Sequence, residues 1–458
     1  MIHEAHAHRS LWIGYVLSVF CFGLTVWSFY PGFMSADSVG QLTTGRAGEY
    51  SDISSPIMAS LWGKLDQIVE GPALMLIFHN LLFWGACAIF WAATAKRSLK
   101  LGVALIMFGL LPSILPQLVC IWKDISLGAS LLLAVSLIYF ANARQCKLAI
   151  LFSVLPLFYG FATRLNAIPA VVPIAIWSGF VGCRLFFGEG FKARSIAIGL
   201  AYSFVLTVGV YLVTYSLTDW KTTYPYQQIY LYDLAAISAA NHESLVPEYI
   251  SSGENFSPEL VWSRYNTRTV NDLLYKDIPN IGDKPPLRFT EDRAELADLK
   301  AKWTEAVWSN PLTYLKHKAS VFRVLIGLDR SISMTFFYEG FGYNPAEYRG
   351  NEHNPGYIVL MKYLGAFRRP LPQTLFHRAI VWMVLCIYFM YCSVKQKFEG
   401  DWEIVFVLSV SSMLFMLSYF PTTPSTEYRY LFWSALATAV TTIFGVYLIR
   451  TNRTEQVR

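Results

Sequence analysis

Residues 11–37 read LWIGYVLSVFCFGLTVWSFYPGFMSAD, and this stretch indicates the class of fold. No charged side chain occurs in it before Asp37, and about 20 mostly apolar residues suffice for a helix to cross a bilayer. The apolar run closes with Tyr30-Pro31-Gly32, and a carboxylate follows within a few residues. The stretch therefore predicts a membrane-spanning helix that leads into a polar loop at one membrane face.

The same kind of apolar stretch recurs along the chain. The 458 residues are 54% hydrophobic and only 15% charged, against roughly 25% charged in a soluble globular chain. We therefore predict an all-α polytopic membrane protein with about ten transmembrane helices. Their approximate ranges are 11–34, 72–95, 101–121, 125–143, 148–163, 167–186, 195–217, 375–394, 403–420 and 430–449.

Basic residues gather at every second short connection, and this alternation predicts the orientation. Cytoplasmic loops of membrane proteins carry an excess of Lys and Arg. On this rule both termini are cytoplasmic, and the net charge of +6 reports orientation and not nucleic-acid binding. The residues on the predicted cytoplasmic side are Arg9, Lys96, Arg97, Lys100, Arg144, Lys147, Arg184, Lys192, Arg194, Lys395, Lys397, Arg450, Arg453 and Arg458.

Three regions follow from the pattern: an N-terminal transmembrane module (1–217), an extracytoplasmic insert (218–374) and C-terminal transmembrane helices (375–458). Within the first outer loop, 35–70, residues 55–65 have the spacing of an amphipathic helix lying on the membrane surface. The connection around Lys123 is predicted to be only about three residues long, which makes the third and fourth spans a tight hairpin or nearly one bent helix. In the insert, 292–315 reads helical with an interruption at Asn310-Pro311. Its expected inward face is Leu296, Leu299, Trp303, Val307 and Trp308.

Asp37 is the first candidate for chemistry. A carboxylate at a membrane surface, partly removed from water, can act as a general base. The other interpretation is an ordinary helix-capping or solvated aspartate. Asp52 is a weaker candidate of the same kind.

Three cations lie at the ends of predicted outer hairpins, namely Lys123, Arg164 and Arg429. Together they form a plausible phosphate site, since arginine binds phosphate bidentately and lysine acts as a point charge. The alternative is that each one pairs locally or extends to the membrane interface. The polar residues expected to support the site are Asp124, Asn166, Glu427 and Tyr428.

Several classes of protein are disfavoured by what the sequence lacks. There is no Walker A motif and no Asp-x-Asp motif, so neither ATP-driven transport nor a metal-chelated nucleotide sugar is expected. The span interiors carry almost no charged residues, although ion-coupled transporters usually need them. We expect no cofactor and no resident metal in the site, and the sequence leaves metal dependence open.

The chain resembles the multispanning GT-C glycosyltransferases, in their bacterial branch of dolichol-phosphate-mannose or lipid-A-type transferase-like proteins. The similarity rests on Tyr-Pro-Gly at 30–32, SADSVGQ at 35–41, YSDISSP at 50–56 and Leu61-Trp62. WKD at 122–124, RLN at 164–166, and WSNP at 308–311 with YLKH at 314–317 add to it. Many relatives have His-Pro where this chain has Ser55-Pro56.

The resemblance implies an inverting transferase whose catalytic base is Asp37. Its donor would be a hexose or pentose on a polyprenyl phosphate, bound among membrane lipids, and its acceptor a glycan such as O-antigen or other lipopolysaccharide, a lipid or a protein. Two alternatives remain: a flippase or transporter of a lipid-linked glycan, and a noncatalytic membrane assembly subunit.

Overall fold

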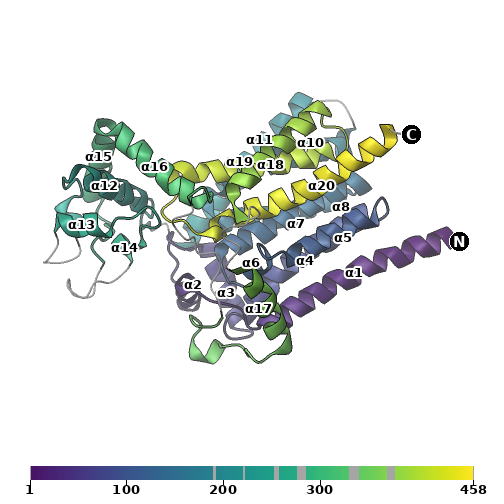
Figure 1. Cartoon of the computed structure of the whole chain (residues 1–458), viewed down its shortest axis with the longest axis horizontal. Coiled ribbons are helices and arrows are strands. Elements are labelled where there is room, and N and C mark those ends of the chain that lie inside the picture. Colours follow the sequence, from purple (N-terminus) through teal and green to yellow (C-terminus); the bar gives the residue numbers. More distant parts are fainter. Residues whose placement is uncertain are drawn as a thin grey trace.

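The structure is a computed structural model that describes residues 2–188, 192–219, 222–251, 257–275, 285–329, 340–368 and 377–456. Within these ranges every regular element is a helix, apart from three isolated β-bridges. The long helices lie side by side along one direction, with both chain termini at the same end (Figure 1). We call this end the terminal face, and the opposite end, which carries the insert, the insert face.

Seven helices of the described chain are long and apolar enough to cross a membrane. α7 is central, since it packs against α4, α9, α10 and α20. α11 lies at the periphery and exposes apolar side chains such as Phe204 and Val205, as lipid-facing helices do. The protein is therefore a helical membrane protein. The seven helices are α1 (Ile2–Phe29), α4 (Ala73–Thr94), α7 (Lys123–Arg144), α10 (Ile168–Phe187), α11 (Lys192–Leu217), α19 (Trp402–Thr422) and α20 (Phe432–Gln456).

Three shorter apolar helices coincide with the other predicted spans. α5 (Leu99–Met107) continues into η1 (Phe108–Leu110), and α18 (Ala379–Lys395) packs against α19 and α20. α8 (Lys147–Phe152) and α9 (Val154–Thr163) form one apolar segment with a joint at Ser153. The connection from α9 to α10 is short, as expected, and contains only Arg164 and η2 (Leu165–Ala167).

The prediction of a tight hairpin at Lys123 is wrong. Between η1 and α7 the chain runs irregularly through residues 111–122 and includes only the one-turn α6 (Leu115–Leu118). Leu111 is extended because it precedes Pro112, and a residue before proline avoids the helical region. The apolar composition of this segment favours a helix, but its prolines prevent the preceding helix from continuing through it. The freed segment reaches the first loop, where Phe33 and Cys120 form a parallel bridge.

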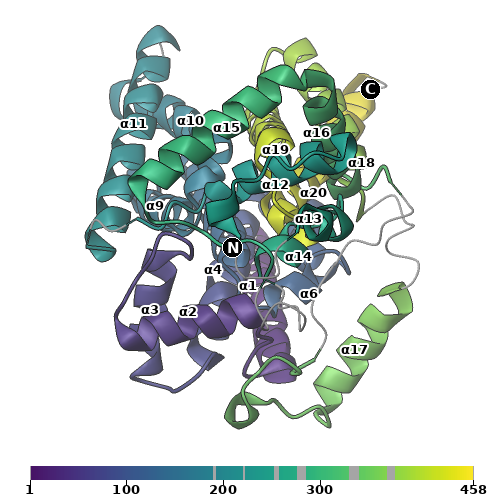
Figure 2. The same cartoon turned by 90° about the vertical axis from the view of Figure 1, so that its left-hand side faces the viewer.

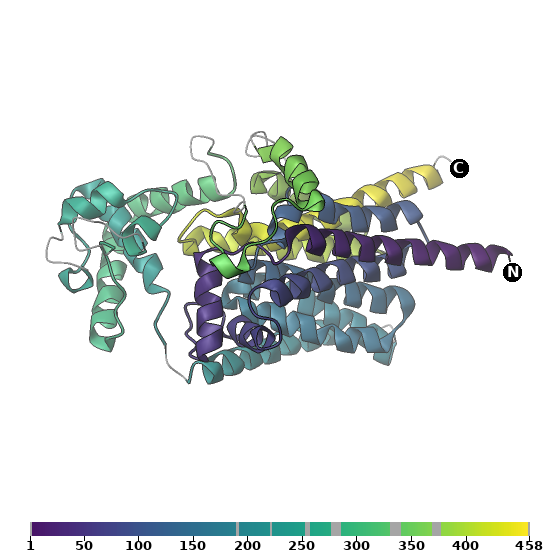
Figure 3. The same cartoon turned by 90° about the horizontal axis from the view of Figure 1, so that it is seen from below.

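The first loop forms two helices that cross the insert face of the bundle, α2 (Ala36–Ala47) and α3 (Pro56–Asp66) (Figure 3). α3 is the helix expected over 55–65, capped by Ser55, whose side chain accepts from the Met58 N–H. Its apolar face contacts protein, since Met58 and Trp62 are fully buried. The surface on which α3 lies is therefore formed in large part by the rest of the chain.

Part of the insert has its own small core, in which Leu231, Leu273, Leu299 and Val321 meet. The predicted helix over 292–315 is present in two pieces that meet at Asn310-Pro311. Leu296 and Leu299 face inward as expected, whereas Trp308 is 79% exposed, so its predicted place in the inward face is wrong. The helices are α12 (Gln227–Asn241), η3 (Glu248–Ile250), α13 (Pro258–Arg264), α14 (Asn271–Leu274), α15 (Arg293–Ser309) and α16 (Pro311–Leu325).

The last described part of the insert returns to the bundle. It contains η5 (Ala346–Tyr348) and α17 (Pro355–Arg368), and α17 packs against α1. Seen along the bundle, α12 to α16 lie in front of its end, while α2, α3 and α17 lie lower (Figure 2). The apolar composition of 320–337 favours contact with the spans or the bilayer, but residues 330–337 of this segment lie outside the described residues.

Candidate functional site

Asp37 lies in the first turn of α2, on the insert face. Ser35 precedes the helix in an extended conformation, and its backbone N–H donates to Oγ of Ser38 at 3.0 Å. Its hydroxyl accepts from the indole N–H of Trp122 at 2.9 Å. A negative charge near a helix N-terminus is favourable because of the helix dipole. The start of α2, and with it Asp37, is thus fixed against the connection that leads into α7.

The structure brings Asp37 together with the three cations predicted from the sequence. Nη2 of Arg429 lies 2.6 Å from Oδ2 of Asp37, whose side chain remains 61% exposed. Partial burial alone would raise the pKa of Asp37. The positive charges of Arg429, Lys123 and Arg164, with the hydrogen bond from Arg429, outweigh that effect and hold the pKa below its ordinary value. Asp37 is therefore an ionised, accessible carboxylate in a cationic surrounding.

Arg429 belongs to η8 (Tyr428–Leu431) and is held on several sides. Only 8% of the residue is exposed. Its Nε pairs with Glu427, and its guanidinium lies over the Trp122 ring, 4.9 Å from the ring centroid. A planar guanidinium between a carboxylate and an aromatic face has little rotational freedom. Glu427 and Trp122 therefore orient the group that contacts Asp37.

Arg164 forms a second, more deeply buried ion pair. Its Nη1 contacts Oδ1 of Asp124, whose side chain is only 2% exposed. The guanidinium also lies over the Tyr430 ring at 4.9 Å, and Tyr430 stacks on Tyr419. Asp124, expected only as a supporting residue, thus pairs with Arg164, and a buried pair of this kind is costly to break from one side.

Lys123 is the first residue of α7 and differs from the two arginines. Its Nζ lies 3.4 Å from the backbone oxygen of Ile53, and no carboxylate is recorded within ion-pair distance among the described residues. Its charge acts on Asp37 from a distance. Of the three cations, Lys123 is the one that a bound anion could engage without breaking an existing ion pair.

Asp52, the weaker candidate base, and the predicted supporting residues Tyr428 and Asn166 make no contact with Asp37 that the structure records among its described ion pairs and hydrogen bonds. Oδ1 of Asp52 accepts from the N–H of Thr223, at 2.8 Å, and from its hydroxyl, so it fixes the start of the insert. Tyr428 is buried against Trp382, with ring centroids 5.8 Å apart. Asn166 is exposed on η2 beside Arg164.

Tyr275 of the insert was not predicted from the sequence. Burial, followed by the negative charge of Asp37, raises its pKa to about 12, so the phenol is close enough to Asp37 to be affected by its charge. The residue is 50% exposed and follows α14 directly. Nothing in its local sequence distinguishes it from the other tyrosines of the insert.

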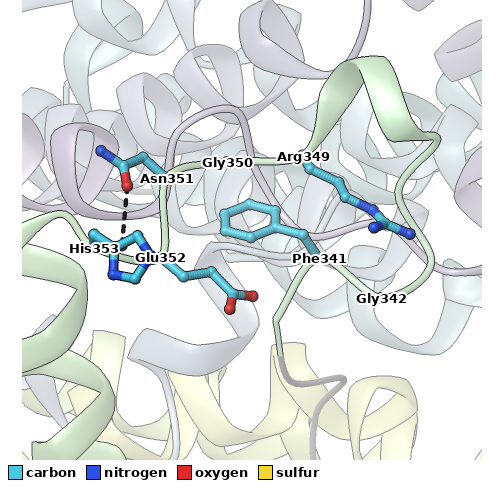
Figure 4. Close-up of a pocket in the computed structure, with 7 residues that line it drawn as sticks. All are labelled: Phe341, Gly342, Arg349, Gly350, Asn351, Glu352 and His353. Carbon is cyan, nitrogen blue, oxygen red and sulfur yellow. Dashed lines mark hydrogen bonds between the residues drawn. The ribbon is translucent and has the colours of Figure 1, made fainter.

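Asn344, also not singled out from the sequence, fastens the returning insert to the first loop. Its side-chain oxygen accepts from the N–H of Met34 at 3.0 Å, and its amide donates to the Gly32 oxygen at 2.9 Å. The same insert segment forms an open pocket of about 400 Å³ around Phe341 and Gly350 (Figure 4). Arg349 points away from Glu352 in this view. The pocket contains none of the predicted site residues.

In the segment Tyr314-Leu315-Lys316-His317, His317 is buried in the insert, whereas Leu315 and Lys316 are exposed. Both His317 and Lys318 contact Oδ1 of the fully buried Asp233, at 3.1 and 2.5 Å. Trp303 donates to its other oxygen at 3.0 Å. Burial lowers the pKa of His317 despite the carboxylate beside it. This network is a structural element of the insert and lies outside the cluster around Asp37.

No protein-family model matches the chain, and no curated protein or solved structure is detectably similar to it. Among the described residues, no three His, Cys, Asp or Glu side chains are grouped as metal ligands would be. The site is therefore interpreted from its own geometry: one accessible carboxylate, one lysine that contacts a backbone oxygen, and two arginines held in ion pairs.

Proposed function

We propose that this protein is an inverting glycosyltransferase that moves a sugar from a polyprenyl-phosphate donor to an acceptor hydroxyl. The observation that carries the proposal is the convergence of Lys123, Arg164 and Arg429 around Asp37. Each cation comes from a different connection on the insert face. A carboxylate for the acceptor and cations for a phosphate are the two groups that such a transfer needs.

In the proposed reaction, Asp37 takes the proton of the acceptor hydroxyl. At the same time the oxygen of that hydroxyl attacks the anomeric carbon of the sugar. The bond between that carbon and the phosphate oxygen breaks, and the electron pair leaves with the lipid phosphate. Lys123 and Arg429 stabilise the charge that develops there, since fixed cations act most strongly in a site from which water is largely excluded. Arg164, held by Asp124, adds positive potential without needing to move.

The Asp37–Arg429 pair gives donor binding a role in activating the base. In the structure the pair lowers the pKa of Asp37, which makes the carboxylate a weaker base. A donor phosphate that competes for Arg429 would relieve this attraction, and the partial burial of Asp37 would then raise its pKa. The base would gain strength only when a leaving group is in place.

The membrane arrangement is part of the proposal. We place the insert face on the outer side of a bacterial inner membrane and both termini in the cytoplasm, with the three shorter apolar helices completing ten spans. The lipid tail of the donor would lie along the bundle, and the insert, through Tyr275, would border the acceptor. The acceptor would be a glycan, a lipid or a protein.

The test is transfer by the purified protein. A polyprenyl-phosphate sugar with a mixture of cell-envelope acceptors should give a glycosylated product, and a nucleotide sugar alone should give none. Direct transfer from the nucleotide sugar would refute the donor assignment. Movement of a lipid-linked glycan across vesicle membranes without transfer, unaffected by Asp37→Asn, would support the flippase alternative. An assembly subunit would show neither activity.

A further inference from the structure

A second site lies at the terminal face, between the start of α5 and the end of α20. Here the two helices border an open groove of about 710 Å³. Its wall is apolar, with Ala104 on one side and Val446 on the other, and its rim carries Lys100 and Arg450. The groove and the cluster around Asp37 are thus at opposite ends of the bundle (Figure 1).

The rim of the groove is suited to an anion. Both Lys100 and Arg450 are exposed, and none of the described residues that line the groove is acidic. Lys100 also lies in the first turn of α5, which Ser98 caps by accepting from the Leu101 N–H at 3.3 Å. The N-terminus of a helix carries partial positive charge and unpaired N–H groups, which attract phosphate.

A third positive charge lies behind the wall. The guanidinium of Arg97 lies 5.3 Å from the centroid of the Tyr447 ring, and Tyr447 lines the groove. Arg97 is paired with Asp401, which also accepts from Tyr139 at 3.1 Å. Arg97 therefore supports the Tyr447 side of the groove, and Lys100 and Arg450 supply the exposed positive charges of its rim.

The combination of an apolar wall and a basic rim selects one kind of ligand. An inorganic anion would leave the wall unused, and a neutral lipid would leave the cations unused. We propose that the groove binds an anionic phospholipid, with its headgroup phosphate at Lys100, Arg450 and the α5 N-terminus and one acyl chain along Ala104 and Val446. Basic pockets between transmembrane helices on the cytoplasmic side commonly bind such headgroups.

Native mass spectrometry of the detergent-purified chain tests this with phosphatidylglycerol and phosphatidylcholine as probes. The wild type should retain phosphatidylglycerol in clear preference to phosphatidylcholine. Lys100→Ala with Arg450→Ala should weaken phosphatidylglycerol binding roughly 10- to 30-fold, because each basic residue contributes separately to headgroup binding. Lys96→Ala with Lys397→Ala removes the same charge from exposed positions at the same face and should leave binding unchanged.

A second variant keeps the charges and fills the groove. Ala104→Trp should reduce phosphatidylglycerol binding, while glycerol phosphate, which has the headgroup but no chain, should bind weakly to every variant. Equal retention of both lipids, equal loss in the two charge variants, or glycerol phosphate binding as strong as that of the lipid would overturn the proposal. The readout does not depend on sugar transfer, and melting temperatures identify a variant that fails to fold.

Discussion

Nη2 of Arg429 lies 2.6 Å from Oδ2 of Asp37, so the last connection of the bundle contacts the first. Both groups belong to short, well-fixed segments: α2 is anchored through Ser35 to Trp122, and Arg429 lies over that same indole ring. The indole of Trp122 thus contacts Arg429 and also Ser35, the residue that precedes the helix carrying Asp37. The spacing between carboxylate and guanidinium is therefore set by the packing of the bundle.

Asp37→Asn should reduce sugar transfer by roughly 10²- to 10⁴-fold, because an amide cannot take the acceptor proton. Transfer of a radiolabelled sugar from a polyprenyl-phosphate donor measures this. Asp52→Asn is the matched control, since its side-chain oxygen can still accept from Thr223, and it should retain near-normal turnover. Equal activity of the two variants would exclude Asp37 as the base.

Arg429→Gln should move the acid limb of the pH–rate profile to higher pH. Burial raises the pKa of Asp37 and the cations lower it, so removing Arg429 lets that pKa rise. A base works only when ionised, so activity would then be lost earlier as the pH falls. Profiles scaled to each variant's own maximum separate this shift from weaker donor binding. Lys64→Gln, which removes an exposed charge from α3, should leave the midpoint in place. If Arg429→Gln also leaves the midpoint of the acid limb unchanged, the titrating group is not Asp37.

Asp124→Leu should destabilise the protein by roughly 3–5 kcal/mol, because it leaves the guanidinium of Arg164 without its buried partner. Combining it with Arg164→Met should restore much of the loss, since no unpaired charge remains. Thermal unfolding in detergent of the wild type, the two single variants and the double variant measures the coupling energy of the pair. Arg184→Met, which breaks a more exposed pair with Glu403, should cost no more than about 1 kcal/mol. Additive losses in the double variant would mean that the pair is not coupled.

Gly63→Ala should destabilise the first loop by roughly 1–3 kcal/mol and lower transfer. α2 and α3 touch where a Cβ on Gly63 would overlap the backbone of Gly45, so the methyl group must push α2 away. Gly40→Ala is the control on the neighbouring helix α2: a Cβ there meets nothing within 4 Å, and alanine is the better helix former. Unfolding temperature and transfer should both distinguish the two variants, and similar behaviour would contradict this packing argument.

The proposed topology predicts which positions a membrane-impermeant thiol reagent reaches in intact cells. In a background with the seven native cysteines replaced by alanine, Ser263→Cys should be labelled, because Ser263 is exposed on α13. Gln145→Cys, exposed between α7 and α8, should react only after permeabilisation. Labelling of the second position alone would reverse the orientation and place the cluster around Asp37 on the cytoplasmic side.

The sequence predicted the charged cluster because a transmembrane chain alternates between two faces. Lys123, Arg164 and Arg429 follow odd numbers of spans, as Asp37 does, so they had to share one face. Alternation gives no information on lateral position, and the contact of Arg429 with Asp37 depends on how α20 packs beside α7. Whether these residues carry the proposed roles stays a prediction.

Other features depend on contacts distant in sequence. The fold of the insert determines two of these contacts. They are the hydrogen bonds from Thr223 to Asp52 and the proximity of Tyr275 to Asp37. The irregular conformation of residues 111–122 was not predicted, for a different reason. Its apolar residues suit a span, and only the local effect of Pro112 and Pro116 on the backbone ends the helix there.

The distribution of the cluster along the chain has a consequence for biosynthesis. Asp37 is made early, Asp124 and Arg164 follow, and Arg429 enters the membrane only with the final pair of helices. A nascent chain that has inserted α1 to α11 already contains both Asp124 and Arg164, but Arg429, the partner of Asp37, has not yet been translated. The complete cluster therefore cannot form before the final hairpin is made, and a prematurely terminated polypeptide would lack the guanidinium that contacts Asp37.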